Sequence, residues 1–214
     1  MPKCIALMGN IIRHLLYISL ISMERHPLQP FLPPNARILM LGSFPPPQKR
    51  WSINFFYPNM QNDMWRIYGL IFFHDKDYFV DLPNKRFNKP LLEEFLRKKG
   101  VAIFDTATVV NRLQNNASDK FLEIVEPTDI SLLLKQIPLC HAIVTTGQKA
   151  TDTLRTLFDI PEPKVGSWVD FMFDKRPMRL YRMPSSSRAY PLKIEKKAAF
   201  YETMLKEEGL LTEE

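Results

Sequence analysis

The stretch from Phe55 to Ile67, FFYPNMQNDMWRI, places three aromatic side chains directly before two asparagines, Asn59 and Asn62. An asparagine ahead of a helix commonly accepts a hydrogen bond from the first turn, and one such cap is enough. Because two asparagines precede one helical pattern, one of them is available for another role. The stretch is therefore either an aromatic-rich core helix with a polar cap or part of a pocket for a flat ligand.

A run of basic residues near the C-terminus could bind phosphate groups. The segment from Lys175 to Lys197 contains eight basic residues and one acid, Glu195, and the chain carries a net charge of +6. The basic residues are Lys175, Arg176, Arg179, Arg182, Arg188, Lys193, Lys196 and Lys197. A nucleic-acid backbone suits such a cluster, although a solvated basic surface has the same composition.

These polar segments need elements that position them, and four short apolar runs are suitable. The runs are residues 37–43 (RILMLGS), 101–107 (VAIFDTA), 141–147 (HAIVTTG) and 178–187 (MRLYRMPSSS). Each leads through a polar loop towards a helical pattern: the first helix is expected near residues 62–72, and the loop after the second run extends through Ser118. Apolar runs alternating with helical patterns predict βα units and a mainly parallel sheet, hence an α/β fold.

The carboxyl ends of the four runs carry the polar and special-backbone residues. These ends read GSFPPP, DTA, TTGQ and MPSSSR, and the stretch from Phe55 follows the first of them. In open α/β sheets, ligands bind outside the carboxyl ends of the strands. Although βα loops are polar in general, this concentration predicts the site at that edge of the sheet.

The composition indicates one soluble domain without a metal or cofactor. The chain has 214 residues, 45% of them apolar, and shows no repeat. Two cysteines, Cys4 and Cys140, exclude a disulfide framework and four-cysteine zinc or iron–sulfur sites, and the four histidines show no ligand spacing. We expect a monomer in the reducing cytoplasm.

The first 22 residues are expected to be an N-terminal extension outside the core domain, which would span residues 23–214. Residues 5–22 are apolar but interrupted by Arg13 and His14, so the run is too short and broken to span a membrane. No small-residue cleavage site follows to support a signal peptide. Translation from Met23 is a third interpretation of this segment.

Several of these stretches together resemble the uracil-DNA glycosylase superfamily, most closely its hypoxanthine-DNA glycosylase and mismatch-specific branches. LMLGSFPP resembles a strand ending in Gly-x-x-Pro-Gly, with Pro46 in place of the final glycine. FYPNMQNDMW resembles an aromatic pair followed by His-Pro-x-Asn-x-Phe-Trp, with Asn59 and Met60 in place of His-Pro. GVAIFDT, TTGQKA and MPSSSRA resemble further family motifs, in the family's order, over roughly residues 35–205.

The resemblance implies a three-layer α/β/α sandwich around a four-stranded parallel sheet. It also implies a DNA-repair glycosylase that flips a deaminated base, uracil or hypoxanthine, out of double-stranded DNA and hydrolyses its bond to deoxyribose. The reaction leaves an abasic site and needs no metal, cofactor or covalent nucleophile.

The resemblance also assigns roles to individual residues. Asn62 and Asp105 would be catalytic, and Tyr57 would stack on the base. Asn62 could equally cap the helix, and Asp105 could orient water, read a base edge or only bond neighbouring backbone. The other residues expected to contact substrate are Gly42, Ser43, Phe44, Pro45, Asn59, Ser185 and Ser186, and those expected to contact DNA are Ser187, Arg188 and Lys193.

Two positions depart from the pattern of many relatives, because Phe44 and Met183 stand where polar side chains are common. They favour an alternative in which the fold is kept as a catalytically weak or inactive DNA-binding module for damaged or mismatched DNA. A different α/β hydrolase or nucleotide-binding enzyme is a third class. Against it, the sequence has no G-x-S-x-G, Walker or G-x-G-x-x-G motif.

Overall fold

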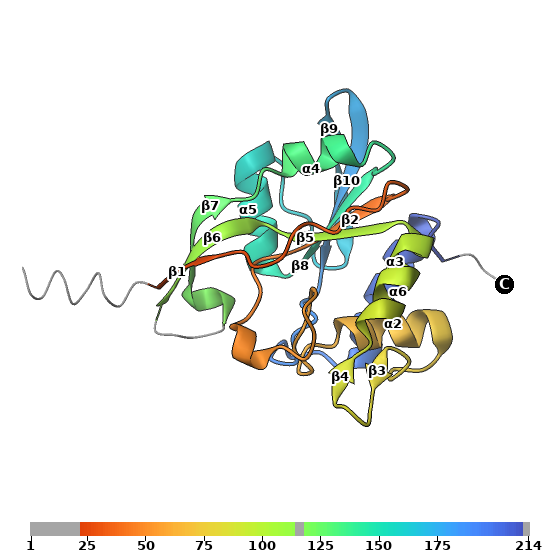
Figure 1. Cartoon of the computed structure of the whole chain (residues 1–214). Helices are drawn as coiled ribbons and strands as arrows, with labels where there is room; N and C mark the ends of the chain where they lie inside the picture. Colours follow the sequence, from red (N-terminus) through yellow and green to blue (C-terminus); the bar gives the residue numbers. More distant parts are fainter. Residues whose placement is uncertain (1–21, 114–117, 212–214) are drawn as a thin grey trace, which may run out of the picture.

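The computed structural model describes residues 22–113 and 118–211, and its centre is a five-stranded sheet (Figure 1). The strand order is β5-β2-β8-β10-β9. The strands are β2 (Ile38–Gly42), β5 (Val101–Asp105), β8 (Ala142–Thr146), β9 (Ser167–Phe173) and β10 (Arg176–Met183). β2, β5, β8 and β10 are parallel, which confirms the four strands predicted from the apolar runs.

The fifth strand, β9, was not predicted and makes the sheet larger than expected. β9 pairs antiparallel with β10, and Asp174 and Lys175 at the turn between them both have positive φ. Two consecutive residues of this kind form the type I′ turn that suits the twist of a hairpin. The strand lies at the edge of the sheet with most of its residues partly or fully exposed, so its sequence lacks the continuous apolar run of the central strands.

Helices cover both faces of the sheet and give three layers (Figure 1). α2 (Met64–Phe73), α3 (Lys89–Lys99) and α6 (Ile194–Glu207) lie on one face, and α4 (Ile130–Gln136) and α5 (Gln148–Phe158) lie on the other. Because both faces are covered, every residue of β2, β5 and β8 is buried. The three-layer α/β/α fold expected from the sequence is therefore confirmed.

The order of the strands creates a switch point between β2 and β8. The chain leaves β2 through α2 and α3 to reach β5 on one side, whereas it leaves β8 through α5 towards β10 on the other. Ligands of open α/β sheets bind at the carboxyl ends of the two strands that flank such a reversal. Here these ends are Gly42 on β2 and Thr146 on β8.

A second, three-stranded sheet stands where a polar loop through Ser118 was expected. β1 (Ser22–Arg25), β6 (Ala107–Arg112) and β7 (Leu122–Pro127) pair antiparallel in the order β1-β6-β7. β6 follows β5 after one intervening residue, so the chain passes directly from the central sheet into the small one. The loop prediction failed because these strands alternate polar and apolar residues and bury their apolar side chains against distant segments.

The remaining elements are short: η1 (Gln48–Arg50), β3 (Val80–Asp81), β4 (Arg86–Phe87) and η3 (Asp119–Phe121). The expected N-terminal extension lies outside the described residues, apart from Ser22 in β1. Within residues 22–113 and 118–211, no helix has the length and apolar character needed to cross a membrane.

Candidate functional site

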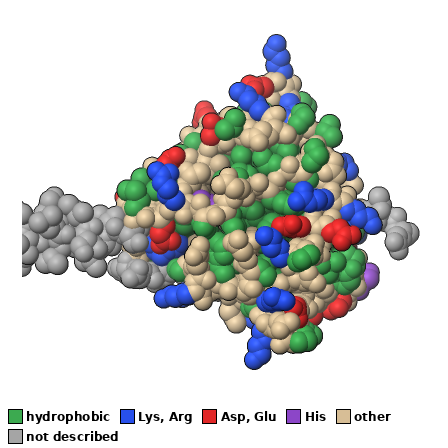
Figure 2. Space-filling view, viewed as in Figure 1, with side chains coloured by type: hydrophobic (Ala, Val, Ile, Leu, Met, Phe, Trp, Pro, Cys, Tyr) green, Lys and Arg blue, Asp and Glu red, His purple; other side chains and the backbone are tan. Residues whose placement is uncertain are grey.

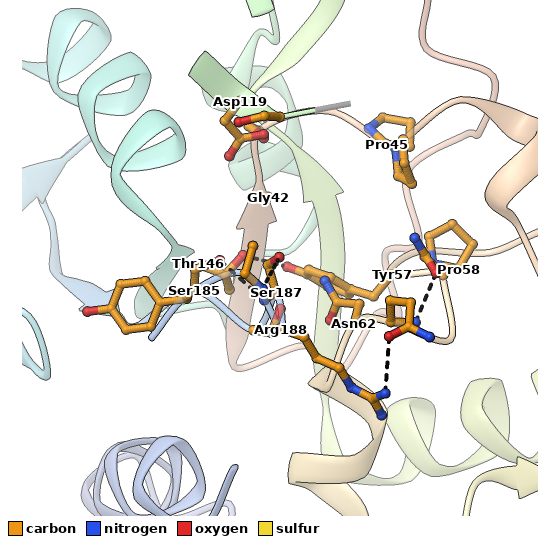
Figure 3. Close-up of a pocket in the computed structure, with 18 of the residues that line it drawn as sticks. Gly42, Pro45, Tyr57, Pro58, Asn62, Asp119, Thr146, Ser185, Ser187 and Arg188 are labelled. Carbon is orange, nitrogen blue, oxygen red and sulfur yellow. Dashed lines mark hydrogen bonds between the residues drawn. The ribbon is translucent and has the colours of Figure 1, made fainter. Parts of the chain in front are cut away.

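A pocket of about 700 Å³ opens at the switch point of the sheet (Figure 3). Of the residues predicted from the sequence, the lining includes Gly42, Ser43, Phe44, Pro45, Tyr57, Asn59, Asn62, Asp105, Ser185, Ser186, Ser187 and Arg188. The fold therefore gathers these residues from four separate segments of the chain. The lining also includes residues that were not predicted, among them Arg50, Gln61, Asp119, Thr146 and Tyr190.

The carboxylate of Asp105 lines the pocket and pairs with a buried histidine. Asp105 ends β5, and its Oδ2 lies 2.8 Å from Nε2 of His26. The two side chains are only 9% and 3% exposed. One alternative left open for Asp105 was a bond to neighbouring backbone, and its side chain makes none among the residues that the structure describes. His26 was missed because it lies 79 residues from Asp105 along the chain and a lone histidine has no spacing signal.

Gly42 leaves the space that this carboxylate occupies. Gly42 lies opposite Asp105 in the register between β2 and β5. A Cβ built on Gly42 would lie 2.3 Å from Oδ1 of Asp105. Backbone freedom does not explain the glycine, because Gly42 is not among the described glycines with positive φ. Residue 42 must be glycine for steric reasons.

Tyr57 forms one wall of the pocket, and its hydroxyl is held by Thr146 (Figure 3). The Tyr57 hydroxyl lies 2.9 Å from Oγ1 of Thr146, and its ring meets Trp65 edge to face at 5.7 Å. Tyr57 has a φ of 47°, a strained conformation for a bulky residue. Burial, followed by the charge of Asp105, raises the pKa of Tyr57 above its usual range. The phenol is therefore a neutral, fixed ring.

One asparagine was expected to cap the helix and the other to be available for another role, but both side-chain oxygens accept hydrogen bonds from the backbone. Oδ1 of Asn62 accepts a hydrogen bond at 2.9 Å from the backbone N–H of Met64, the first residue of α2, whose N-cap is Asp63. Oδ1 of Asn59 accepts from Gln61 N–H at 2.9 Å and stabilises the preceding turn. Among the described residues, Nδ2 of Asn62 donates no hydrogen bond. Asn62 therefore binds the first N–H of α2 with its oxygen and still offers an N–H donor to a ligand.

Asp63 holds the serine-rich loop, which contains Ser185, Ser186 and Ser187, against the start of α2. Asp63 N–H donates to Ser186 O at 2.9 Å. The Asp63 carboxylate accepts from Nε of Arg188 at 2.8 Å and from Nζ of Lys197 at 3.4 Å, and Lys197 also donates to Ser187 O. Both Asp63 and Lys197 are buried. These contacts fix the loop against the segment that carries Asn62.

The serines of this loop do not cap the following helix. α6 begins at Ile194, with Lys193 as its N-cap. Ser185 Oγ instead accepts from Ser187 N–H at 3.3 Å, and Ser187 Oγ accepts from Ala189 N–H at 3.2 Å. The hydroxyls thus stabilise the turns of the loop itself.

The basic run from Lys175 to Lys197 does not form one continuous surface. Arg176 donates to carbonyls at the end of α4, Arg179 pairs with Glu208, and Arg182 pairs with Glu162. Figure 2 shows Lys and Arg side chains interspersed with acidic ones on the face in view. Of the predicted DNA contacts, Lys193 is exposed and does not line the pocket.

The two departures from the family motifs, Phe44 and Met183, are buried at 8% and 1% exposure. Phe44 packs against a small apolar cluster built by the second sheet, namely Ala107, Val110 and Leu122. Its ring also meets His26 edge to face at 5.3 Å. Phe44 therefore lines the pocket and packs against the second sheet behind it.

Asp119 adds a second carboxylate to the pocket. Its Oδ1 accepts a hydrogen bond from Ser43 Oγ at 2.8 Å. Desolvation by the surrounding protein raises the pKa of Asp119, opposed by the Ser43 hydrogen bond and reinforced by the charge of Asp105. Two carboxylates in one pocket disfavour a ligand with negative charge at this depth, and they favour a neutral ligand or one that develops positive charge.

Comparisons with known proteins establish the fold. No protein-family model and no curated protein matches the sequence. The chain is similar to the solution NMR structure of a "putative Uracil DNA glycosylase" from Methanosarcina acetivorans, with a TM-score of 0.58 and 20% sequence identity. The alignment covers 88% of this chain and 99% of that chain. The chain therefore has a uracil-DNA glycosylase-like fold.

Proposed function

We propose that the protein is a member of the uracil-DNA glycosylase superfamily that hydrolyses the N-glycosidic bond of a flipped, deaminated base. The observation that carries this proposal is the pairing of groups in one pocket: a fixed carboxylate, Asp105, and an uncommitted amide donor on Asn62. The name of the structural neighbour agrees with this reaction class.

The bond between base and sugar breaks with positive charge on the sugar and negative charge on the leaving base. A carboxylate near the sugar carbon stabilises the positive charge and can orient the attacking water. Asp105 is suited to this task because His26 holds its Oδ2 while Oδ1 lies beside Gly42. The amide of Asn62 is suited to the leaving base, since a fixed N–H donor stabilises an oxygen that gains negative charge.

The same donor favours deaminated bases as substrates. Uracil and hypoxanthine carry a carbonyl oxygen where cytosine and adenine carry an amino group. An N–H donor in a desolvated pocket pairs with the carbonyl and is left unpaired against an amino group, which costs about 1–3 kcal/mol. The ring of Tyr57 provides a face on which the flipped base can stack, with a contribution of about 1–3 kcal/mol.

The test is release of a base from defined duplexes. Oligonucleotides with uracil, hypoxanthine or xanthine opposite each normal base are incubated with the protein and then cleaved at abasic sites with alkali. We expect strand scission on at least one of these substrates and none on the undamaged duplex. The Asp105→Asn protein, purified in parallel, controls for contaminating glycosylases. Intact strands with every substrate contradict the enzyme proposal.

A catalytically inactive DNA-binding module is the second candidate, and the burial of Phe44 and Met183 favours it. Neither side chain can donate a hydrogen bond to a base. This alternative predicts tight binding to duplexes with an abasic or mismatched site and no scission in the same assay.

Arg188 is expected to contact a DNA phosphate at the rim of the pocket. Its Nε and Nη1 bond Asp63 and Gln61, whereas Nη2 donates no hydrogen bond among the described residues. Arg188→Ala should weaken duplex binding about tenfold and reduce the salt slope by about one. Fluorescence anisotropy at several salt concentrations measures both quantities.

Arg176→Ala is the matched control, because Arg176 lies at the other end of β10 and caps α4. We expect this substitution to lower the thermal midpoint and to leave the salt slope unchanged. Equal salt slopes for all three proteins contradict the assignment of Arg188.

A further inference from the structure

We propose that His26 is a positioning residue that holds the Asp105 carboxylate in its working orientation. We also propose that the three-stranded sheet β1-β6-β7 places His26 beside Asp105. The expected effect of His26 on catalysis rests on the proposed function. Nothing in the motifs singles out His26, and its role follows from contacts between segments that are distant in the sequence.

The hydrogen bond between the two side chains has a fixed direction. An ionised carboxylate only accepts, so Nε2 of His26 must carry the proton donated to Oδ2 of Asp105. The other ring nitrogen, Nδ1, lies 3.2 Å from the N–H of Leu28 and 3.0 Å from its carbonyl oxygen. Nδ1 can accept from the first when the ring is neutral or donate to the second when it is charged. In both states Nε2 keeps its proton for Asp105.

Aromatic packing holds the imidazole in place. The rings of Phe44, Phe104 and Phe56 lie 5.3, 4.6 and 6.2 Å from the centre of the His26 ring. These three rings restrict the rotation of the imidazole away from Asp105. Phe44 thereby gains a role, because a polar residue at this position would not close the apolar box around the imidazole.

The charged and titratable groups near the pair come from several elements. On the pocket side, the charge of Asp105 acts on Tyr57 and on Asp119. On the small sheet, Arg112 on β6 pairs with Glu24 on β1 and also lies near the Phe44 ring. None of these groups donates a hydrogen bond to the Asp105 side chain among the described residues, so His26 is its donor.

The small sheet explains how His26 arrives there. β6 continues from β5 after Asp105 and Thr106, and β1 pairs with β6 along its whole length. His26 follows β1 directly and extends the pairing, since its N–H donates to Thr108 O at 2.8 Å. The register therefore places His26 beside the carboxyl end of β5, where Asp105 stands.

Two substitutions test the role of the donor. His26→Leu removes the donor but keeps an apolar side chain in the aromatic box, and His26→Gln retains an N–H near the position of Nε2. In single-turnover base release, we expect His26→Leu to be slower by about 30-fold and His26→Gln to recover most of that loss. The affinity for an abasic duplex should stay within about twofold in both, because the rim contacts are intact.

The result that overturns the inference is base release by His26→Leu at the wild-type rate while Asp105→Asn is inactive. The proposed function would then stand without the histidine. If wild type releases no base, the proposed function fails and the pairing is tested separately by ¹⁵N NMR of the imidazole. We expect an Nε2-protonated ring in wild type and a changed Nε2 signal in Asp105→Ala. An unchanged signal contradicts the pairing itself.

Discussion

Asn62→Asp is expected to keep the fold and to lower base release by about 100-fold or more. Aspartate at position 62 still presents an oxygen to Met64 N–H, so this hydrogen bond at the start of α2 survives. The N–H donor is lost, and a negative charge takes its place beside a base that leaves as an anion. Single-turnover rates on a uracil or hypoxanthine duplex measure the loss, and circular dichroism with a thermal melt monitors the fold.

Asn62→Ala and Asn59→Ala complete this experiment. Asn62→Ala removes both the hydrogen bond to Met64 N–H and the donor, so it should lose activity and also about 1 kcal/mol of unfolding free energy. Asn59→Ala removes only a turn contact with Gln61 N–H and should retain most of the rate. Wild-type release by Asn62→Asp shows that the amide does not stabilise the leaving base.

Gly42→Ala is expected to abolish base release and to destabilise the fold by about 1–3 kcal/mol. The added methyl would lie 2.3 Å from Oδ1 of Asp105, a distance at which one group must move. Since β2 is fully buried and Gly42 is held in register with β5, we expect the carboxylate to move and to leave its bond with His26. Chemical denaturation and single-turnover kinetics measure the two effects.

A double-mutant cycle with Asp105→Ala shows whether Gly42 acts through the carboxylate. Without the Asp105 side chain, alanine at position 42 has space, so Gly42→Ala should cost little stability in that background. Equal destabilisation in both backgrounds would mean that the methyl disturbs the strand itself, and the steric explanation of Gly42 would be wrong.

The parallel core of the fold could be predicted because its signal is local. β2, β5 and β8 are buried on both faces, so each appears in the sequence as an uninterrupted apolar run between polar loops. β9 and β6 depend on partners for their stability. Their half-exposed sequences do not differ from polar loops until the pairing with β10 or β1 is known.

The site was predicted to the extent that it follows from strand ends. Asp105 could be assigned to the pocket in this way, and Asn62 through the family resemblance. The atoms that the two residues offer could not be predicted. The free group of Asn62 is its N–H because Met64 N–H takes the oxygen. The free oxygen of Asp105 is Oδ1 because His26 takes the other. Both facts depend on hydrogen bonds that cannot be recognised from motifs or residue spacing.

The pairing of β1 with β6 has a consequence for the dynamics of the protein. β1 has four residues and lies at the edge of the small sheet. Short edge strands open locally at a free-energy cost well below that of global unfolding. Each such opening withdraws His26 while the five-stranded sheet and the rest of the pocket remain intact. Amide hydrogen exchange in residues 23–26 would therefore report how often the protein visits a folded state with an unsupported carboxylate.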